Sequence, residues 1–220
     1  MISDNRQKLL QQIAGACRKN GRSPSDVQLM AASKQQSVDV IESAIAAGQI
    51  LFGENRVQEA QAKWPDIKRR HPHVRLHLIG LLQSNKTRAA LEIFDGIQSI
   101  DRDSIIDTIL KYPNLCSGKE FFIQINIGSE AQKSGIMPGD ADAFIARASR
   151  QLPVVGLMAI PPLDADPAPH FHALASMAKK HHLAQLSMGM SADLDVAIAC
   201  GATMVRVGTA LFGARPTVKA

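Results

Sequence analysis

Eight short apolar runs recur along this chain, and their recurrence constrains the fold more than any other feature of the sequence. Segments with helical periodicity lie between them, such as the one that carries Val38, Ile41 and Ile45 on one face. The runs span residues 27–33, 50–55, 75–80, 96–100, 121–127, 154–160, 183–188 and 203–208. Strands that alternate with helices in this way are typical of a parallel sheet.

The number of repeats favours one parallel architecture. A leading helix over residues 1–21 ends at the helix-stop pair Asn20-Gly21, and eight β/α repeats follow it. This order predicts an α/β fold with a single (β/α)8 TIM-type barrel over residues 27–213 and a tail at 214–220. No Pro/Gly/Ser-rich linker divides the chain, so we expect residues 1–220 to form one domain. An open doubly wound sheet is the alternative.

The alternation of side chains within the runs supports the barrel. In a barrel, one side-chain parity of each strand meets the surrounding helices and the other points into the interior. Here one parity is mainly apolar and the other collects polar groups, namely His77, Gln98, Ser187 and Arg206, with Lys34 following the first run on the same parity. An interior with this much polarity near the carboxyl ends of its strands needs a polar occupant.

Charge and composition argue against a nucleic-acid partner. The 25 Lys and Arg residues outnumber the 20 Asp and Glu residues, which gives a net charge of +5. The basic residues are nevertheless scattered, and aromatic residues make up only 4% of the chain. Side chains on which bases could stack are therefore scarce, and we expect no nucleic acid to bind.

Membrane contact, disulfides and metals are also not expected. No apolar run approaches the roughly 20 residues of a membrane-spanning helix, and the first residues are polar, so we expect a cytoplasmic protein. Cys17, Cys116 and Cys200 lie far apart without CxxC spacing, which favours reduced thiols. The histidine pairs lack further ligands at suitable spacing, so no metal site is predicted.

Two features predict chemistry at the mouth of the barrel. Lys34 follows the first run and would bring an amine to the catalytic rim. Arg206, Gly208 and Thr209 end the eighth run, where a glycine turn and a hydroxyl can cradle a phosphate. Ser191, after the seventh run, is expected to be the N-cap of the helix that follows it, with Asp193 in the first turn, and this helix start could bind an anion. An amine and a phosphate cradle on opposite sides of the mouth suggest a cofactor that carries an aldehyde and a phosphate, pyridoxal 5′-phosphate (PLP).

Arg206 then gains a role toward the cofactor ring. A guanidinium that faces the pyridine nitrogen would keep that nitrogen unprotonated and weaken the ring as an electron sink. Two simpler interpretations stay open: Arg206 pairs with a buried carboxylate, and Lys34 is a solvated lysine at the end of a strand.

Seven motifs, in order along the chain, carry a family resemblance. They are AASK at 31–34, FGEN at 52–55, HLIGLLQSNK at 77–86, KSGI at 133–136, GLMAIP at 156–161, SMGMS at 187–191 and MVRVGTALFG at 204–213. Together they closely resemble the pyridoxal phosphate homeostasis protein family. The resemblance implies a fold-type III PLP barrel like the N-terminal domain of alanine racemase.

The resemblance also implies the cofactor-binding residues. They are Lys34, Asn55, Ser187, Met188, Ser191, Arg206, Gly208 and Thr209. Lys34 would be the Schiff-base lysine, Asn55 would lie near the ring, Met188 would pack beside it, and Arg206 would face its nitrogen. Ser191, Gly208 and Thr209 would hold the phosphate, with Ser187 nearby.

The function expected from this resemblance is intracellular PLP homeostasis. Family members are regarded as carriers or regulators of the vitamin B6 pool, which implies a non-catalytic monomer that supplies PLP to apo-enzymes. One alternative is an amino-acid racemase or decarboxylase of the same fold type, but Tyr112 is the only tyrosine that could act as a second base. Another is a sugar-phosphate barrel that uses Lys34 as an aldolase-type lysine. The roles of Lys86 and Lys133 are left unassigned.

Overall fold

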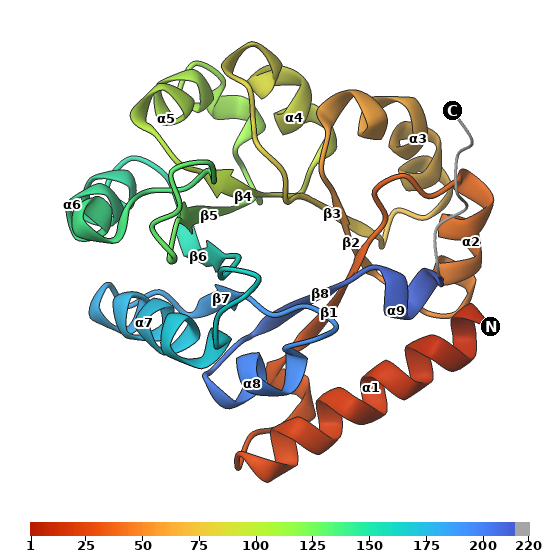
Figure 1. Ribbon diagram of the computed structural model, residues 1–220. Coiled ribbons are helices and arrows are strands. Elements are labelled where there is room, and N and C mark those ends of the chain that lie inside the picture. Colours follow the sequence, from red (N-terminus) through yellow and green to blue (C-terminus); the bar gives the residue numbers. More distant parts are fainter. Residues whose placement is uncertain (214–220) are drawn as a thin grey trace.

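The computed structural model describes residues 1–213, so the expected tail at 214–220 lies outside the described residues. Eight parallel strands close into a barrel in sequence order, and helices surround it (Figure 1). The strands are β1 Gln28–Ala32, β2 Leu51–Glu54, β3 Arg75–Leu78, β4 Gly96–Ile100, β5 Glu120–Ile125, β6 Val154–Ala159, β7 Gln185–Ser187 and β8 Met204–Val207. The (β/α)8 barrel predicted from the sequence is confirmed.

The α-helices alternate with the strands, and three short 3-10 helices lie in the connections. The α-helices are α1 Ile2–Lys19, α2 Val38–Ala46, α3 Val57–Arg70, α4 Thr87–Ile93, α5 Asp103–Ile109, α6 Pro138–Ala148, α7 Pro167–Lys180, α8 Leu194–Ala199 and α9 Thr209–Phe212. The 3-10 helices are η1 Pro24–Asp26, η2 Ser84–Lys86 and η3 Pro113–Leu115.

Pairing between β1 and β8 closes the barrel and excludes the open sheet. The register runs from Gln28 opposite Met204 to Ala31 opposite Val207. All eight expected strands form, although most are shorter than the apolar runs. The run at 183–188 shrinks to Gln185–Ser187 because the Leu183 N–H still donates to the Ala178 carbonyl in the turn that ends α7.

The two side-chain parities build two separate apolar clusters. The smaller cluster fills the barrel interior and consists of Met30, Leu51, Phe122, Met158 and Met204. The larger one lies between the strands and the helices, where parallel strands meet the helices that cover them. The polar residues predicted to point inward on β3, β4, β7 and β8 are all buried, so this prediction is confirmed.

Helix α1 covers the barrel beside α8 and α9 (Figure 1). Leu9, Ile13 and Cys17 are buried on its inner face, because they recur at helical spacing. The Asn5 amide donates to the Leu211 carbonyl at 3.0 Å and joins α1 to α9. Leu10, which the apolar pattern also places on this face, is 38% exposed. Among residues 1–213, no helix is both long and apolar enough to cross a bilayer.

Candidate functional site

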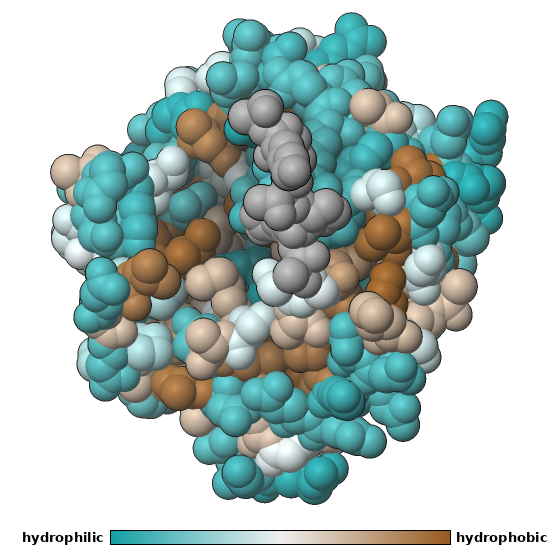
Figure 2. Space-filling view, turned by 45° about the vertical axis from the view of Figure 1, so that its right-hand side comes forward, coloured by the Kyte–Doolittle hydropathy of each residue, from teal (hydrophilic) through white to brown (hydrophobic). Residues whose placement is uncertain are grey.

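The carboxyl ends of the strands form an open mouth with three adjoining cavities. Their volumes are about 550, 260 and 170 Å³, and Asn55 lines all three. Figure 2 shows several separate apolar patches on this face, among hydrophilic residues that dominate its outline. Three of the exposed apolar residues, Leu81, Ile160 and Met190, follow β3, β6 and β7. The mouth therefore combines polar side chains with an apolar rim.

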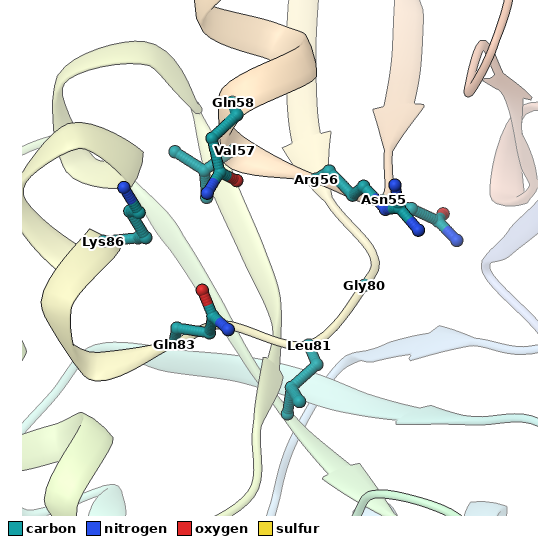
Figure 3. Close-up of a pocket in the computed structure, with 8 residues that line it drawn as sticks. All are labelled: Asn55, Arg56, Val57, Gln58, Gly80, Leu81, Gln83 and Lys86. Atoms are coloured by element: carbon teal, nitrogen blue, oxygen red, sulfur yellow. The ribbon is translucent and has the colours of Figure 1, made fainter.

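The largest cavity lies between the start of α3 and the loop that follows β3. Figure 3 shows Lys86, Gln58 and Gln83 turned toward the space between these segments, whereas Arg56 and Asn55 point away from Lys86. Lys133 lines the second cavity, and it pairs with Glu130 and donates to the Pro161 carbonyl at 3.1 Å. Two cationic side chains therefore stand on different cavities of the same mouth.

Lys34 lies two residues beyond the end of β1 and is half-buried. It lines the smallest cavity together with Asn55 and Glu59. The next residue, Gln35, has a φ of 62°, a left-handed conformation that is uncommon for a residue other than glycine. The chain therefore turns sharply after Lys34, and the amine stays at the mouth.

A buried carboxylate holds the segment that carries Lys34. Glu54 is fully buried at the end of β2, and its Oε1 accepts hydrogen bonds from Ser33 Oγ at 2.8 Å, Lys63 Nζ at 2.9 Å and Trp64 Nε1 at 3.1 Å. Glu59 Oε1 accepts from the Gln35 N–H at 2.6 Å and from Lys63 Nζ at 2.8 Å. Ser33 is thus tied to the end of β2, and Gln35 is tied to the first turn of α3.

The surroundings of Glu59 lower the pKa of its carboxyl group, which favours the ionised form. Burial alone would raise its pKa, but the hydrogen bonds from Lys63 and from the Gln35 N–H, together with the positive charge of Lys63, lower it. The sequence analysis gave Glu54, Glu59 and Lys63 no role. The available signal was a glutamate that ends an otherwise apolar run, with Lys63 and Trp64 in the helix that follows.

Asn55 is held beside the mouth by a close backbone approach. A β-carbon built on Gly80 would lie 2.2 Å from the Asn55 carbonyl oxygen. Only glycine fits at this position, since any side chain would push the two strand ends apart. The structure therefore brings Lys34 and Asn55 to the same cavity, as the sequence predicts for two residues of one site.

Arg206 is buried in the barrel interior without a charged partner. Its Nη1 donates to the Ser187 carbonyl at 2.6 Å and to Ser187 Oγ at 2.7 Å, and its Nη2 donates to the Ala159 carbonyl at 2.8 Å. Within residues 1–213 no carboxylate forms an ion pair with it, so the alternative of a buried carboxylate pair is wrong.

Among the described residues, Arg206 has no carboxylate in direct contact that would balance its charge. Burial lowers the pKa of the guanidinium to about 10, and the negative charge of Asp193 acts in the opposite direction. A buried cation without a counter-ion favours a ligand that is anionic or that accepts hydrogen bonds. The donor set of this mouth, an amine and an uncompensated guanidinium, therefore fits a ligand such as PLP.

Two of the predicted phosphate residues, Gly208 and Thr209, follow the strand next to β1, so they lie on the side of Lys34 and not across the mouth from it. β8 pairs with β1, and a β-carbon on Gly208 would lie 3.5 Å from the Ala32 carbonyl oxygen. The expectation of a cradle on the opposite side is therefore wrong, because barrel closure makes the first and last strands neighbours. Gly208 and Thr209 follow β8, and Thr209 is exposed.

Two further expectations near β7 need correction. Ser191 does not cap α8: the helix begins at Leu194 after Asp193, whose carboxylate accepts from the Met190 N–H at 2.6 Å. The exposed Ser191 stands in the turn before it. Met188 is fully buried in the cluster between strands and helices, so its side chain does not face the mouth. It follows Ser187 on the opposite parity.

The comparisons with known proteins now decide the family. The model for the alanine racemase N-terminal domain matches residues 10–216. A pyridoxal phosphate homeostasis protein of Vibrio cholerae is 41% identical over 227 residues, which cover 97% of this chain and 96% of that protein. The chain belongs to the pyridoxal phosphate homeostasis protein family. The resemblance noted in the sequence is thereby confirmed.

Solved structures agree with this membership. The structure of PipY from Synechococcus elongatus with PLP bound matches with a TM-score of 0.80 and 34% identity, and the match covers 97% of this chain and all of PipY. Alanine racemase from Corynebacterium glutamicum shares the fold, with a TM-score of 0.69 at 18% identity, and this chain covers 62% of it. Among the described residues of this homeostasis-family member, no three His, Cys, Asp or Glu side chains gather as a metal would require.

Proposed function

We propose that this chain binds PLP through Lys34 and acts as a carrier that maintains the PLP supply, without turnover of its own. The observation that carries the proposal is Arg206, a buried cation that lacks a counter-ion and sits on a strand paired directly with the one Lys34 follows. Support also comes from PipY, whose structure contains PLP, and from relatives named pyridoxal phosphate homeostasis protein.

Each proposed contact uses a group of matching chemistry. PLP, when bound, supplies an aldehyde that can link reversibly to an amine. Lys34 Nζ would form this link at the mouth, and Asn55 would lie beside the ring. Arg206 would donate to the ring nitrogen. We keep Ser191, Gly208 and Thr209 as the phosphate residues, because they follow two paired strands whose carboxyl ends lie together. Any contribution of Met188 would come from its backbone.

A carrier needs a reversible link and an open site, and the mouth offers both. The cavities around Lys34 and Asn55 open at the carboxyl ends of the strands, so the cofactor could leave toward an apo-enzyme. A monomeric state is part of this proposal. Cys17, Cys116 and Cys200 are free thiols, which supports the cytoplasm as the proposed location.

Borohydride trapping tests the proposal. PLP added to the purified protein should give a yellow product, and borohydride reduction followed by peptide mapping should find the cofactor on Lys34. Lys34→Ala should lose the visible band, whereas the control Lys179→Ala, at an exposed residue of α7, should keep it. Trapping on another lysine as the sole primary site would reject Lys34, and no PLP binding at all would reject the function.

A further inference from the structure

A continuous line of polar side chains crosses the barrel interior from Arg206 to the amino ends of the strands. Ser187 Oγ lies 2.7 Å from Arg206 Nη1 and 2.6 Å from Gln98 Oε1. Gln98 Nε2 lies 3.0 Å from His77 Nδ1, and His77 Nε2 lies 3.5 Å from Glu120 Oε2. Ser187, Gln98 and His77 have no exposed surface. Five strands contribute to this line, which we call the interior chain.

The direction of the hydrogen bonds is fixed at the Arg206 end. A guanidinium can only donate, so the Ser187 hydroxyl must accept from it. The single hydroxyl proton of Ser187 is then available for Gln98 Oε1, which lies at 2.6 Å. Ser187 therefore accepts a hydrogen bond from Arg206 and donates one to Gln98, and the reverse direction is not possible.

Met204 fixes the orientation of the Gln98 amide. Its thioether Sδ, a weak acceptor that cannot donate, lies 3.0 Å from Gln98 Nε2. The opposite amide orientation would place two acceptors against each other at this distance. Nε2 is therefore the group that faces both Met204 and His77, and His77 Nδ1 must accept.

At the far end of the interior chain, no hydrogen bond joins His77 to Glu120. If His77 Nδ1 accepts, the proton of the neutral ring is on Nε2, which lies near Glu120 Oε2 without a hydrogen-bond partner among the described residues. Arg75 Nη2 holds that carboxylate at 2.8 Å. Burial lowers the pKa of His77 to about 4, so the ring is neutral near pH 7. The hydrogen bonds that begin at Arg206 thus require one tautomer of His77.

Gly96 makes room for the imidazole. It is the partner of His77 in the register of β3 and β4, and a β-carbon there would lie 2.5 Å from the His77 ring. The ring centroid of Phe122 lies 6.2 Å away on the other side. The position of His77 is therefore set by packing as well as by Gln98.

The contacts of Arg206 leave one edge of its guanidinium available. Three of its five N–H groups donate to Ser187 and Ala159, all from Nη1 and Nη2. Nε and the second N–H of Nη2 have no acceptor among the described residues. The Nε–H lies on the edge of the planar guanidinium that is turned away from Nη1, so the interior chain, which holds Nη1, fixes the plane in which that edge donates.

We propose that Ser187, Gln98 and His77 are positioning residues that hold this edge of Arg206 toward the ring nitrogen of PLP. The inference rests on the proposed function, since it takes PLP as the ligand. A fixed donor toward an unprotonated nitrogen favours a pyridine ring over a ring of the same shape without that nitrogen. Residues of the interior chain that do not touch the ligand thereby influence which ligand Arg206 prefers.

A pair of ligands isolates this effect. The dissociation constants of PLP and of 1-deaza-pyridoxal 5′-phosphate, in which CH replaces the ring nitrogen, would be measured for each variant. We expect the preference of the parent for PLP to fall by roughly 5- to 10-fold in Gln98→Met and in His77→Leu, less than for complete loss of a hydrogen bond from a charged group, because Arg206 stays in place and only its orientation is loosened. His77→Asn, whose amide oxygen can still accept from Gln98, should retain most of the preference.

The control lies on the same strand. Ser99→Ala changes a fully buried neighbour of Gln98 whose hydroxyl has no hydrogen-bond partner among the described residues, and it should leave the preference unchanged. A general loosening of the barrel would weaken both ligands equally and leave the ratio of their dissociation constants unaltered. An unaltered ratio in Gln98→Met and His77→Leu, with PLP still bound by the parent, overturns the positioning role and leaves the proposed function standing.

A measurement without the cofactor tests the direction of the interior chain. Nitrogen NMR of the imidazoles in the PLP-free parent should show His77 as the neutral tautomer with its proton on Nε2 at pH 7. The other tautomer or a charged ring would overturn the direction derived above. Failure of the parent to bind PLP would instead reject the proposed function, and this NMR result would be unaffected by it.

Discussion

The hydroxyl of Ser33 donates a hydrogen bond of 2.8 Å to the buried carboxylate of Glu54. This contact joins the ends of β1 and β2 immediately before Lys34, and the Ser33 N–H adds a second bond, to the Gly53 carbonyl at 2.9 Å. Beyond Lys34, Lys63 donates to the Gln36 carbonyl at 3.3 Å. The backbone on both sides of Lys34 is therefore held by hydrogen bonds, whereas the Lys34 amine has no hydrogen-bond partner among the described residues.

Glu54→Gln should loosen this segment. Glutamine cannot replace the charge that Lys63 faces, and it places an NH₂ group where Glu54 Oε2 is buried without a partner. We expect a loss of about 1.5–3 kcal/mol in the free energy of unfolding, measured with urea in the absence of PLP. Weaker PLP binding should accompany it, because the position of Lys34 becomes less defined.

The matched control for this variant is Glu42→Gln. Glu42 also pairs with basic residues, Arg70 and His71, but it does so at the opposite end of α3. It should leave PLP affinity unchanged. If Glu54→Gln binds PLP as tightly as the parent, the Ser33–Glu54 contact does not position Lys34.

The fold and the side-chain parity could be predicted from the sequence because both are local patterns. Alternation within each run places Gln98 and Ser187 in the interior without knowledge of their partners. Their contact could not be predicted, since they lie 89 positions apart and meet only when the barrel closes. Closure also places Gly208 next to Ala32. The order of the runs along the chain does not show this contact, so a phosphate cradle opposite Lys34 is the wrong expectation.

The errors around β7 have a different origin. The parity of the run already places Met188 outward once Ser187 points inward, so the family resemblance and the alternation disagreed about this residue. Asp193, two residues after Ser191, is the residue that precedes the helix. Both residues are good N-caps, and the sequence does not show which of them the turn places before α8.

The neutral His77 predicts a stability that falls in mild acid. Its pKa is about 4 in the folded protein, mainly through burial, against an ordinary value of 6.5. Between these pH values the unfolded chain binds the proton and the folded chain does not, so stability rises with pH across this window. The contribution of His77 to the change is about 3 kcal/mol.

Urea titrations of the parent and of His77→Asn at pH 4 to 7 would measure this contribution. The variant should show a shallower pH dependence across the window, whereas His172→Asn, at an exposed residue of α7, should follow the parent. Glu120, Arg75, Asp95 and Lys68 also act on His77, and they are unchanged in both variants. Equal slopes for the parent and His77→Asn would show that His77 is not the titrating group.

The proposed phosphate residues predict a loss of discrimination between PLP and pyridoxal. Ser191 and Thr209 are exposed and follow the paired strands β7 and β8. Each charge-assisted hydrogen bond lost in Ser191→Ala/Thr209→Ala should weaken PLP binding by about 1.5–3 kcal/mol, with little effect on pyridoxal. The control is Ser176→Ala on α7, and an unchanged PLP affinity in the double variant would place the phosphate elsewhere.

The last prediction concerns catalysis, and it follows from where the acid–base groups lie. Racemisation on a ring with an unprotonated nitrogen needs two well-placed acid–base groups, one on each face. Lys34 would supply one. Tyr112 lies between α5 and η3, ahead of β5, and so at the amino ends of the strands, away from the mouth.

Other polar groups near Lys34 do not replace the missing base. Asn55 carries an amide, and the Ser187 hydroxyl is bound between Arg206 and Gln98. We therefore expect no racemisation, decarboxylation or transamination of alanine or serine, together with measurable transfer of PLP to an apo-enzyme. Transfer would be followed as recovered activity of the acceptor, with Lys34→Ala loaded under the same conditions as the control. Turnover of either amino acid faster than about 1 s⁻¹, the low end of ordinary enzyme rates, would replace the carrier by an enzyme.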